Sequence, residues 1–382
     1  MLKRITNKVC AVLQHRLDNH FEQVNYDKYL KKIRSSYNHL SVKRKLSIQQ
    51  INEIQDYYKK TIGHEVPVEW HQYFYSRTGN YSKLYIPTIE YKTHIIGQLN
   101  IYPLHLAYND KNMTDVTLPH THQPKIILKN MAGYFYTNGK AITKDEALIL
   151  CKNLGDVIIK PSLTGRGNGV RKVHISDGQV DGKQTLGELF DQYHADYLIQ
   201  AVIRQHKEME ALNPSSINTI RIVTYRHEMD IRIVYTVIRI GRKGMNVDNE
   251  SAGGISARIN SDGILAKYAY GAPGDDNIEF TDAGVKLEGY KVPSFDKAID
   301  LVKFSHMQLP YFNLIGWDIA IEEDGSPIMI ELNLNPDLSQ SANGPAFGEY
   351  TDEILGDAMS REDTWTPITT RCMNKRNYKK TK

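Results

Sequence analysis

The sequence predicts an α+β protein in which a helical N-terminal region precedes largely antiparallel sheets. Two observations lead to this fold class. Apolar residues recur at helical spacing in the first part of the chain, whereas from Ile126 onward short apolar runs alternate with turn signals and single helices. With 382 residues, 41% of them hydrophobic, the chain is long enough for two or three domains with cores of their own.

The N-terminal region carries clear helix signals. Ser47 and Gln50 form a capping box, and Gly63 stands just past the expected end of the helix that they begin. An earlier helix is expected from apolar residues at helical spacing, which are Ile5, Val9, Val12, Leu13 and Leu17. We therefore expect residues 1–85 to be a helical region and residues 86–125 to connect it to the sheets.

Residues 126–205 are expected to form a first α+β unit. The runs KIIL and VIIK are typical of strands, and YLIQAVI is a third candidate. One helix is predicted between the first two strands and another ahead of the third. Capping boxes mark the starts of these helices, which are Thr143 with Glu146 and Thr185 with Glu188.

Residues 206–355 are expected to form a second unit built from strand pairs. SINTIRIVTY pairs with IRIVYTVIRI, and GGISARI pairs with GILAKYAY across the turn at Asn260–Gly263. A helix over Phe295–Met307 precedes a final hairpin. The basic stretch 356–382 is expected to be a weakly ordered tail.

The composition excludes several classes of protein. No apolar run approaches the roughly 18 residues of a membrane span, and the apolar stretch near the N-terminus is too short for a secretory signal. Cys10, Cys151 and Cys372 lie far apart and form no metal or redox motif, which indicates a reducing, cytoplasmic setting. His120 and His122 lack further His or Cys ligands at suitable spacing, so we expect no zinc site there.

The net charge of +4 is unevenly distributed. Residues 1–61 carry 13 Lys/Arg against 5 Asp/Glu, and residues 371–382 carry six Lys/Arg and no acid. A nucleic-acid enzyme is expected to carry its basic charge on its central domains, so we expect no nucleic-acid partner. The basic ends are either simply solvated, which is the commoner case, or contact an anionic membrane surface or a protein partner.

The final hairpin is the first stretch that indicates chemistry. In GWDIAIEEDGSPIMIELN, the Asp324–Gly325 turn predicts a register in which Asp318 lies opposite Glu331, with Met329 and Asn333 on the face of Glu331. Facing carboxylates repel, and a divalent cation between them removes that repulsion. Two carboxylates and an amide oxygen suit Mg²⁺ bound together with substrate phosphates. The alternative is a solvent-facing hairpin with scattered polar residues, because a one-residue slip would undo the pairing.

The stretch DVIIKPSLTGRGNGVRKV is the second part of the sequence that indicates chemistry. Its strand ends in Lys160 and leads into a loop with Gly165, Gly167 and Gly169, whose backbone could approach phosphate oxygens closely. The pattern is neither a P-loop nor a dinucleotide fingerprint, so a glycine-rich hairpin over ATP phosphates remains, with a flexible surface hairpin as the alternative. Further on, Gln200 ends a strand that could present backbone groups to adenine, although a plain edge strand fits these residues equally well.

The order of these features resembles the ATP-grasp superfamily, and more closely its sugar-transfer-associated branch, over about residues 60–355. Motifs that carry the resemblance are NDKN, IIKP, NTIRIVTYR, VDNESAGGISARI, GWDIAI and IELNLNPDLSQ. The resemblance implies a two-lobed fold with ATP and Mg²⁺, or Mn²⁺ in its place, between the lobes. It implies a small lobe over 126–205 with the glycine loop and a large lobe over 206–355 with the metal site. A helical, basic start in place of the usual α/β lobe is a departure, as is the segment LNPDLSQ, and both leave the substrate open.

The resemblance also implies roles for individual residues. Lys111 and Lys160 match phosphate-binding lysines. The adenine hinge is matched by Gln200 together with the backbone of Ala201, Val202 and Ile203. The ribose contact is matched by Glu208 or, equally well, by Glu210. The implied metal ligands are Asp318, Glu331 and Asn333, and the implied catalytic or substrate-binding residues are Arg221, Arg258 and Asn249.

The function that the resemblance implies is a carboxylate–amine ligase that forms an amide through an acyl phosphate and releases ADP and phosphate. Its partners would be a small carboxylate and an amine, either of which could be sugar-linked, in the modification of a polysaccharide or glycan precursor. An ATP-grasp kinase acting on a sugar or polyol hydroxyl is a second hypothesis, and a nucleotide-binding scaffold in a glycan-assembly complex is a third. Intact Lys160, Asp318, Glu331 and Asn333 argue against the scaffold.

Overall fold

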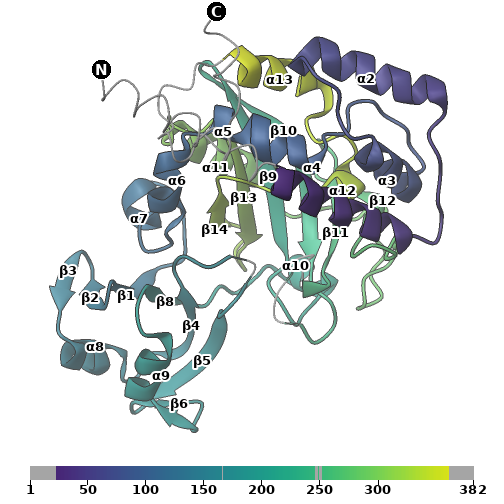
Figure 1. Ribbon diagram of the computed structural model, residues 1–382. Helices are drawn as coiled ribbons and strands as arrows, with labels where there is room; N and C mark the ends of the chain where they lie inside the picture. Colours follow the sequence, from purple (N-terminus) through teal and green to yellow (C-terminus); the bar gives the residue numbers. More distant parts are fainter. Residues whose placement is uncertain (1–22, 166, 246–247, 249–251, 361–382) are drawn as a thin grey trace, which may run out of the picture.

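The computed structural model describes residues 23–165, 167–245, 248 and 252–360. Within them the chain forms two antiparallel sheets and a helical N-terminal region, as the sequence predicts (Figure 1). The expected helix around residues 5–17, Asn249 and the expected C-terminal tail lie outside the described residues. No helix in the described part of the chain is long and apolar enough to cross a membrane.

The N-terminal region is helical throughout its described part. A helix over 23–38 is followed by α2 (Ile48–Ile62) and α3 (Glu69–Thr78). The predicted capping box at Ser47 and Gln50 is present, and Gly63 ends α2 in the left-handed conformation with φ 83°. The segment expected only to connect is also helical, with α4 (Thr88–Glu90), the π-helical turn η1 (Tyr91–Ile95), α5 (Ile96–Leu99), α6 (Tyr102–Asn109) and α7 (Thr114–Thr117).

The first sheet has eight strands in the order β3-β2-β1-β8-β4-β5-β6-β7. Two helices, α8 and α9, begin at the predicted capping boxes and pack on this sheet (Figure 1). The elements of this unit are β1 (Ile126–Met131), β2 (Tyr134–Thr137), β3 (Lys140–Ile142), α8 (Lys144–Cys151), β4 (Gly155–Pro161), β5 (Arg171–Ser176), β6 (Gln179–Val180), β7 (Gln184–Thr185), α9 (Leu186–Tyr193) and β8 (Tyr197–Ala201).

The second sheet has six strands in the order β12-β11-β10-β9-β13-β14. Its strands pair as the sequence predicts, and the predicted helix over Phe295–Met307 is present as α11. The elements of this unit are α10 (Lys207–Leu212), β9 (Thr219–His227), β10 (Asp230–Ile240), β11 (Ile255–Ile259), β12 (Leu265–Tyr270), α11 (Phe295–Met307), β13 (Leu314–Ile321), β14 (Pro327–Asn333), α12 (Gln340–Asn343), the 3₁₀ turn η3 (Gly348–Tyr350) and α13 (Thr351–Ser360). The residue boundaries proposed above for the domains stay predictions.

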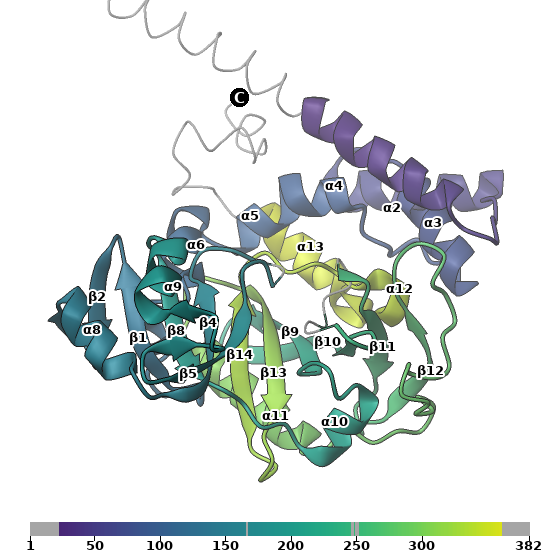
Figure 2. The same cartoon turned by 90° about the horizontal axis from the view of Figure 1, so that it is seen from below.

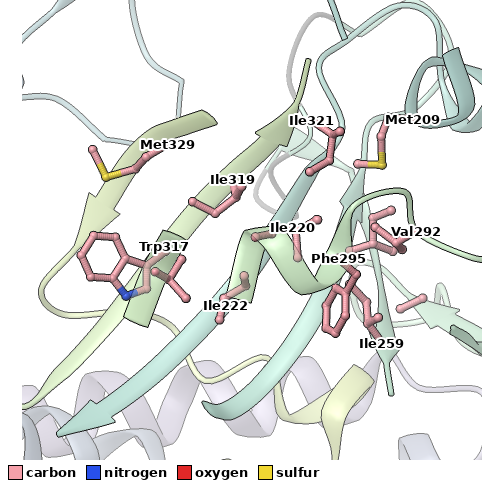
Figure 3. Close-up of a cluster of buried hydrophobic side chains, with 14 of the residues drawn as sticks. Met209, Ile220, Ile222, Ile259, Val292, Phe295, Trp317, Ile319, Ile321 and Met329 are labelled. Atoms are coloured by element: carbon pink, nitrogen blue, oxygen red, sulfur yellow. The ribbon is translucent and has the colours of Figure 1, made fainter. Parts of the chain in front are cut away.

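The two faces of the second sheet differ in what covers them. One face packs against α11 and forms an apolar core in which Ile222, Trp317 and Ile319 are fully buried (Figure 3). The other face is divided. At one end Val223, Tyr225 and Val237 pack under α2, α5 and α13, which lie together in Figure 2. Farther along the same strands this face carries charged side chains instead, which form the candidate site.

The final hairpin reaches the predicted Asp318–Glu331 pair by an unpredicted route. Next to the turn, Ile321 pairs with Pro327 and Ile319 pairs with Met329, one residue out of the predicted register. A β-bulge between Asp318 and Ile319 then restores the predicted pairing. The prediction that Met329 shares the face of Glu331 is therefore wrong. Because the extra residue lies between them on β14, Met329 turns into the apolar core beside Trp317 and Ile319 (Figure 3).

Candidate active site

Asp318 lies at the centre of a buried ion-pair network on the charged face of the second sheet. Arg221, its neighbour on β9, donates from Nε to Oδ1 at 2.5 Å and from Nη2 to Oδ2 at 3.0 Å. Arg239 of β10 donates from Nη1 to the same two oxygens at 3.1 and 3.0 Å. Burial opposes ionisation of Asp318, but the two guanidinium groups outweigh it and hold the pKa of the carboxyl at about 2.

The network continues away from Asp318 to a second buried acid. Arg239 donates from Nη2 to Asp248 at 3.2 Å, and Asp248 also accepts from the hydroxyl of Thr219. Burial raises the pKa of Asp248, and Arg239 only partly opposes that effect. Arg239, Asp248 and Thr219 are not among the sequence-predicted site residues. The usable signal was the arginine next to the last residue of the apolar run IRIVYTVIRI, which breaks the run at a position where only a paired charge is buried.

Glu331 and Asn333 complete the acidic end of this face. Glu331 pairs with Asp318 across the hairpin, and Asn333 donates from Nδ2 to Asp318 Oδ2 at 3.4 Å. The ammonium group of Lys111 lies 3.3 Å from Glu331 Oε1. In this structure the repulsion between the two carboxylates is already relieved by other cations, because Arg221 and Arg239 compensate Asp318 and Lys111 compensates Glu331. The assignment of these three residues as metal ligands stays a prediction.

Lys111 also joins the two sheets. Its ammonium group donates to the carbonyl oxygen of Thr164 in the glycine loop at 2.6 Å, and its backbone N–H donates to the carbonyl oxygen of Ser162 at 3.1 Å. The glycine loop of the first sheet and Glu331 of the second therefore share one cation.

Lys160 is the second cation near Glu331. It is 5% exposed near the end of β4, and its ammonium group makes no hydrogen bond or ion pair with the described residues. Burial lowers the pKa of Lys160 from 10.5 to about 8, with an opposing contribution from Glu331 and a further lowering by Lys111. A buried cation without a partner is costly, which is expected where an anion is to be bound.

The glycine loop between β4 and β5 is a hairpin in which the three predicted glycines differ. Gly167 and Gly169 have φ of 71° and 74°, whereas Gly165 does not require a left-handed backbone. A Cβ at Gly169 would lie 2.8 Å from the Pro161 ring, whereas one at Gly165 would meet nothing within 4 Å. Among the three, the fold therefore constrains Gly169 most and Gly165 least.

A comparison with family models finds a match to sugar-transfer associated ATP-grasp over residues 90–354. The chain belongs to this family. The two antiparallel sheets agree with the ATP-grasp fold that the sequence predicts, whereas the roles of the lysines, the glycine loop and the Asp318–Glu331–Asn333 hairpin stay predictions. A comparison with curated proteins finds no match.

Three solved structures with some likeness to this ATP-grasp chain have low sequence identity to it. The ATP-grasp ligase PsnB complexed with a minimal precursor has 12% identity and a TM-score of 0.37, over 67% of this chain and 62% of that one. The D-alanine–D-alanine ligase of Bacillus anthracis has 14% identity and a TM-score of 0.37, over 67% and 66%. A putative ATP-grasp superfamily protein of Archaeoglobus fulgidus has 14% identity and a TM-score of 0.32, and the match spans 52% of that chain. The chain thus matches less than two thirds of the length of each.

The predicted adenine hinge lies where the first sheet meets the second. Gln200 is buried on β8 between β1 and β4. The N–H of Ala201 donates to the backbone carbonyl oxygen of Lys125. Regular strand pairing of β8 ends at Ala201, so Val202 and Ile203 continue outside the ladder. The chain then reaches the tip of the final hairpin, where the N–H of His206 donates to the carbonyl oxygen of Ile321.

Of the other predicted residues, Arg221 contacts Asp318 directly, whereas Arg258 and Glu208 do not contact the described residues around Asp318 and Glu331. Arg221 holds Asp318 and is not free to bind substrate in this arrangement. Arg258 lies in the same cross-strand row as Arg221 and Asp318, but its side chain is exposed. Glu208 lines a separate cavity of about 590 Å³ with Asp262, Tyr290 and Phe295, in which none of the other predicted residues takes part. Their assigned roles stay predictions.

Proposed function

We propose that the protein is an ATP-dependent ligase that joins a carboxylate to an amine through an acyl phosphate. The observation that carries the proposal is the convergence of Lys111 and Lys160 on Glu331, beside Asp318 and Asn333, at the place where the glycine loop of one sheet meets the charged face of the other. Two cations, a glycine-rich backbone and a set of oxygen ligands together fit a nucleotide triphosphate with a divalent cation.

The residues present fit Mg²⁺. Glu331 and Asp318 offer carboxylate oxygens and Asn333 offers its amide oxygen, because its Nδ2 is already directed at Asp318. Bound there, Mg²⁺ or Mn²⁺ would neutralise charge on the transferring phosphoryl group. Lys160 would hold a phosphate oxygen from the strand floor. Lys111 would give up its ion pair with Glu331 and bind a second phosphate oxygen instead, while it keeps its hydrogen bond to Thr164 in the glycine loop.

The proposed reaction has two steps. A carboxylate oxygen of the acid attacks the γ-phosphorus of ATP, the bond from this phosphorus to the bridging oxygen breaks, and ADP leaves. The amine nitrogen then attacks the acyl carbon, the bond from carbon to the phosphate oxygen breaks, and phosphate and a proton are released. Catalysis by the chain is positioning and electrostatic stabilisation, with no side-chain nucleophile. The family description supports an acid or amine that belongs to a sugar polymer or its precursor.

Trapping with hydroxylamine tests the proposal. The full chain is incubated with ATP, Mg²⁺ and a panel of sugar acids and amino acids, with hydroxylamine in place of the amine. A ligase yields a hydroxamate together with ADP, because hydroxylamine intercepts the acyl phosphate. A stable phosphate ester formed without hydroxamate would overturn the ligase and establish the kinase. Lys160→Met should abolish both products, which serves as the control for a contaminating activity.

A further inference from the structure

Three potential metal ligands converge in the N-terminal helical region, away from the proposed ATP site. Glu90 Oε2 lies 2.9 Å from His64 Nε2 and 2.9 Å from His94 Nδ1. The three ligand atoms all lie within 4.8 Å of one another. Glu90 is 4% exposed, so its carboxylate is held in the protein interior by two imidazole rings.

The partners of Glu90 are unusual for a buried acid. Buried carboxylates are normally compensated by arginine or lysine or by a metal ion, and the described residues provide Glu90 with no such ion pair. A buried carboxylate at hydrogen-bonding distance from two imidazole rings offers a site for a cation.

The backbone explains how these residues meet. His64 follows Gly63, whose left-handed conformation ends α2 and turns the chain. Glu90 is the last residue of α4 and His94 lies in η1, so the pair has the i,i+4 spacing that places two side chains on one side of a helix. The π-helical turn interrupts an otherwise α-helical segment, a local irregularity that often occurs at functional sites.

We propose that His64, Glu90 and His94 bind a Zn²⁺ ion, with water as the fourth ligand. Two imidazole nitrogens and one carboxylate oxygen are a donor set that Zn²⁺ prefers. In a tetrahedral site with bonds of about 2.0–2.1 Å, ligand atoms lie roughly 3.3 Å apart, so the present spacing requires only small side-chain rotations. The side chain of His64 is 41% exposed, which gives the ion and its water access from solvent.

The bound ion would fix the π-helical turn, and this turn also carries Lys92. Lys92 donates to Asn335 Oδ1 at 2.6 Å, two residues after the predicted metal ligand Asn333. The zinc ion would therefore tie the end of α2 to the segment that holds the end of the final hairpin in place. It would be separate from the proposed Mg²⁺ site.

Zinc titration of the full chain tests this proposal. The protein is stripped with a chelator, and Zn²⁺ is added against a competing chromophoric chelator in millimolar Mg²⁺, which keeps the other site from responding. One Zn²⁺ per chain is expected, with an increase in the thermal midpoint. Glu90→Gln and His64→Asn should each weaken binding by at least about 100-fold, because loss of a direct ligand exceeds the 10- to 100-fold effect typical of an outer partner.

Two matched variants decide where the ion binds. His174→Asn removes an exposed histidine that also contacts an acid, Asp156 at 2.7 Å, and should bind Zn²⁺ like the parent. Glu331→Gln alters the proposed Mg²⁺ site and should also bind Zn²⁺ like the parent. Co²⁺ in place of Zn²⁺ should give the strong visible absorption of a four-coordinate site. Absence of Zn²⁺ binding in the parent, or binding lost in Glu331→Gln and kept in Glu90→Gln, would overturn the proposal, whatever the outcome of the ligase test.

Discussion

Replacing Lys160 by methionine should stabilise the protein while weakening ATP binding. Lys160 is buried without a partner among the described residues, and its pKa falls from 10.5 to about 8. A shift of one pKa unit corresponds to about 1.36 kcal/mol, so the buried charge costs about 3 kcal/mol when the ammonium group is fully protonated. Methionine has a similar length and no charge, so the variant should unfold at pH 7 with a free energy up to about 3 kcal/mol higher.

The effect has a defined pH dependence. Below pH 8 both the folded and the unfolded chain carry the proton on Lys160, and the folded protein bears the full cost of the buried charge. Between pH 8 and 10.5 the folded chain releases the proton while the unfolded chain keeps it. The unfolded state then binds more protons, so the stability contributed by this group rises with pH. The difference between the variant and the parent should therefore shrink to almost nothing as the pH approaches 10.5.

Urea unfolding at several pH values measures the gain in stability of Lys160→Met, and calorimetric titration with ATP and Mg²⁺ measures its loss of ATP affinity. Loss of a charge-assisted hydrogen bond of roughly 1.5–3 kcal/mol should weaken ATP binding by about 10- to 150-fold. Lys172→Met is the matched control, since Lys172 is exposed on β5 and pairs with Asp156 at 2.9 Å. It should leave ATP binding unchanged and give no gain in stability. A Lys160→Met protein that is less stable than the parent at pH 7, or that binds ATP normally, would refute the reasoning.

Three further predictions concern the residues around Lys160. Glu331→Gln should abolish Mg²⁺-dependent ATP turnover with little change in urea unfolding, and turnover at the parental rate would disprove the metal assignment. Asp318→Asn should lower the free energy of unfolding by about 3–5 kcal/mol, because it leaves two buried guanidinium groups without their anion; a variant as stable as Glu331→Gln would contradict this. Gly169→Ala should weaken ATP binding more than Gly165→Ala, since only at Gly169 would the added Cβ meet the Pro161 ring, at 2.8 Å; equal affinities in calorimetry would argue against a role for the loop.

Local signals in the sequence predicted much of the fold. Capping boxes such as Thr143 with Glu146 depend on residues three apart, and the structure contains them where the sequence indicates. The pairing of Asp318 with Glu331 was also predicted, but the bulge that restores it was not. The hairpin sequence shows only how β13 and β14 pair with each other, whereas β13 also pairs with the distant strand β9. Side-chain alternation alone therefore assigned Met329 to the wrong face.

Contacts between distant segments were the part that the sequence did not reveal. Arg239 and Asp248 become site residues only because β10 lies next to β9 and β9 next to β13. The contact of Lys92 with Asn335 joins residues 243 positions apart, which no local pattern in the sequence indicates. The sequence likewise directed attention to His120 and His122, which are close in the chain, rather than to His64 and His94, which only the fold brings together.

The bulge in the final hairpin lies between the Asp318–Glu331 pair and the turn, so the register at this pair differs from the register next to the turn. On the site side of the bulge, the position of β13 is fixed by β9, where Asp318 pairs with Arg221. On the turn side, the strands run in a different register and end at the exposed residues Glu323 and Asp324. Deletion of one residue from this turn can therefore be compensated by loss of the bulge, without moving Asp318 relative to Glu331. The tip also contacts the segment that follows the predicted adenine hinge, because the N–H groups of His206 and Glu323 donate to the carbonyl oxygens of Ile321 and Arg204. A shorter turn would therefore act on the connection between the two sheets before it acted on the Asp318–Glu331 pair.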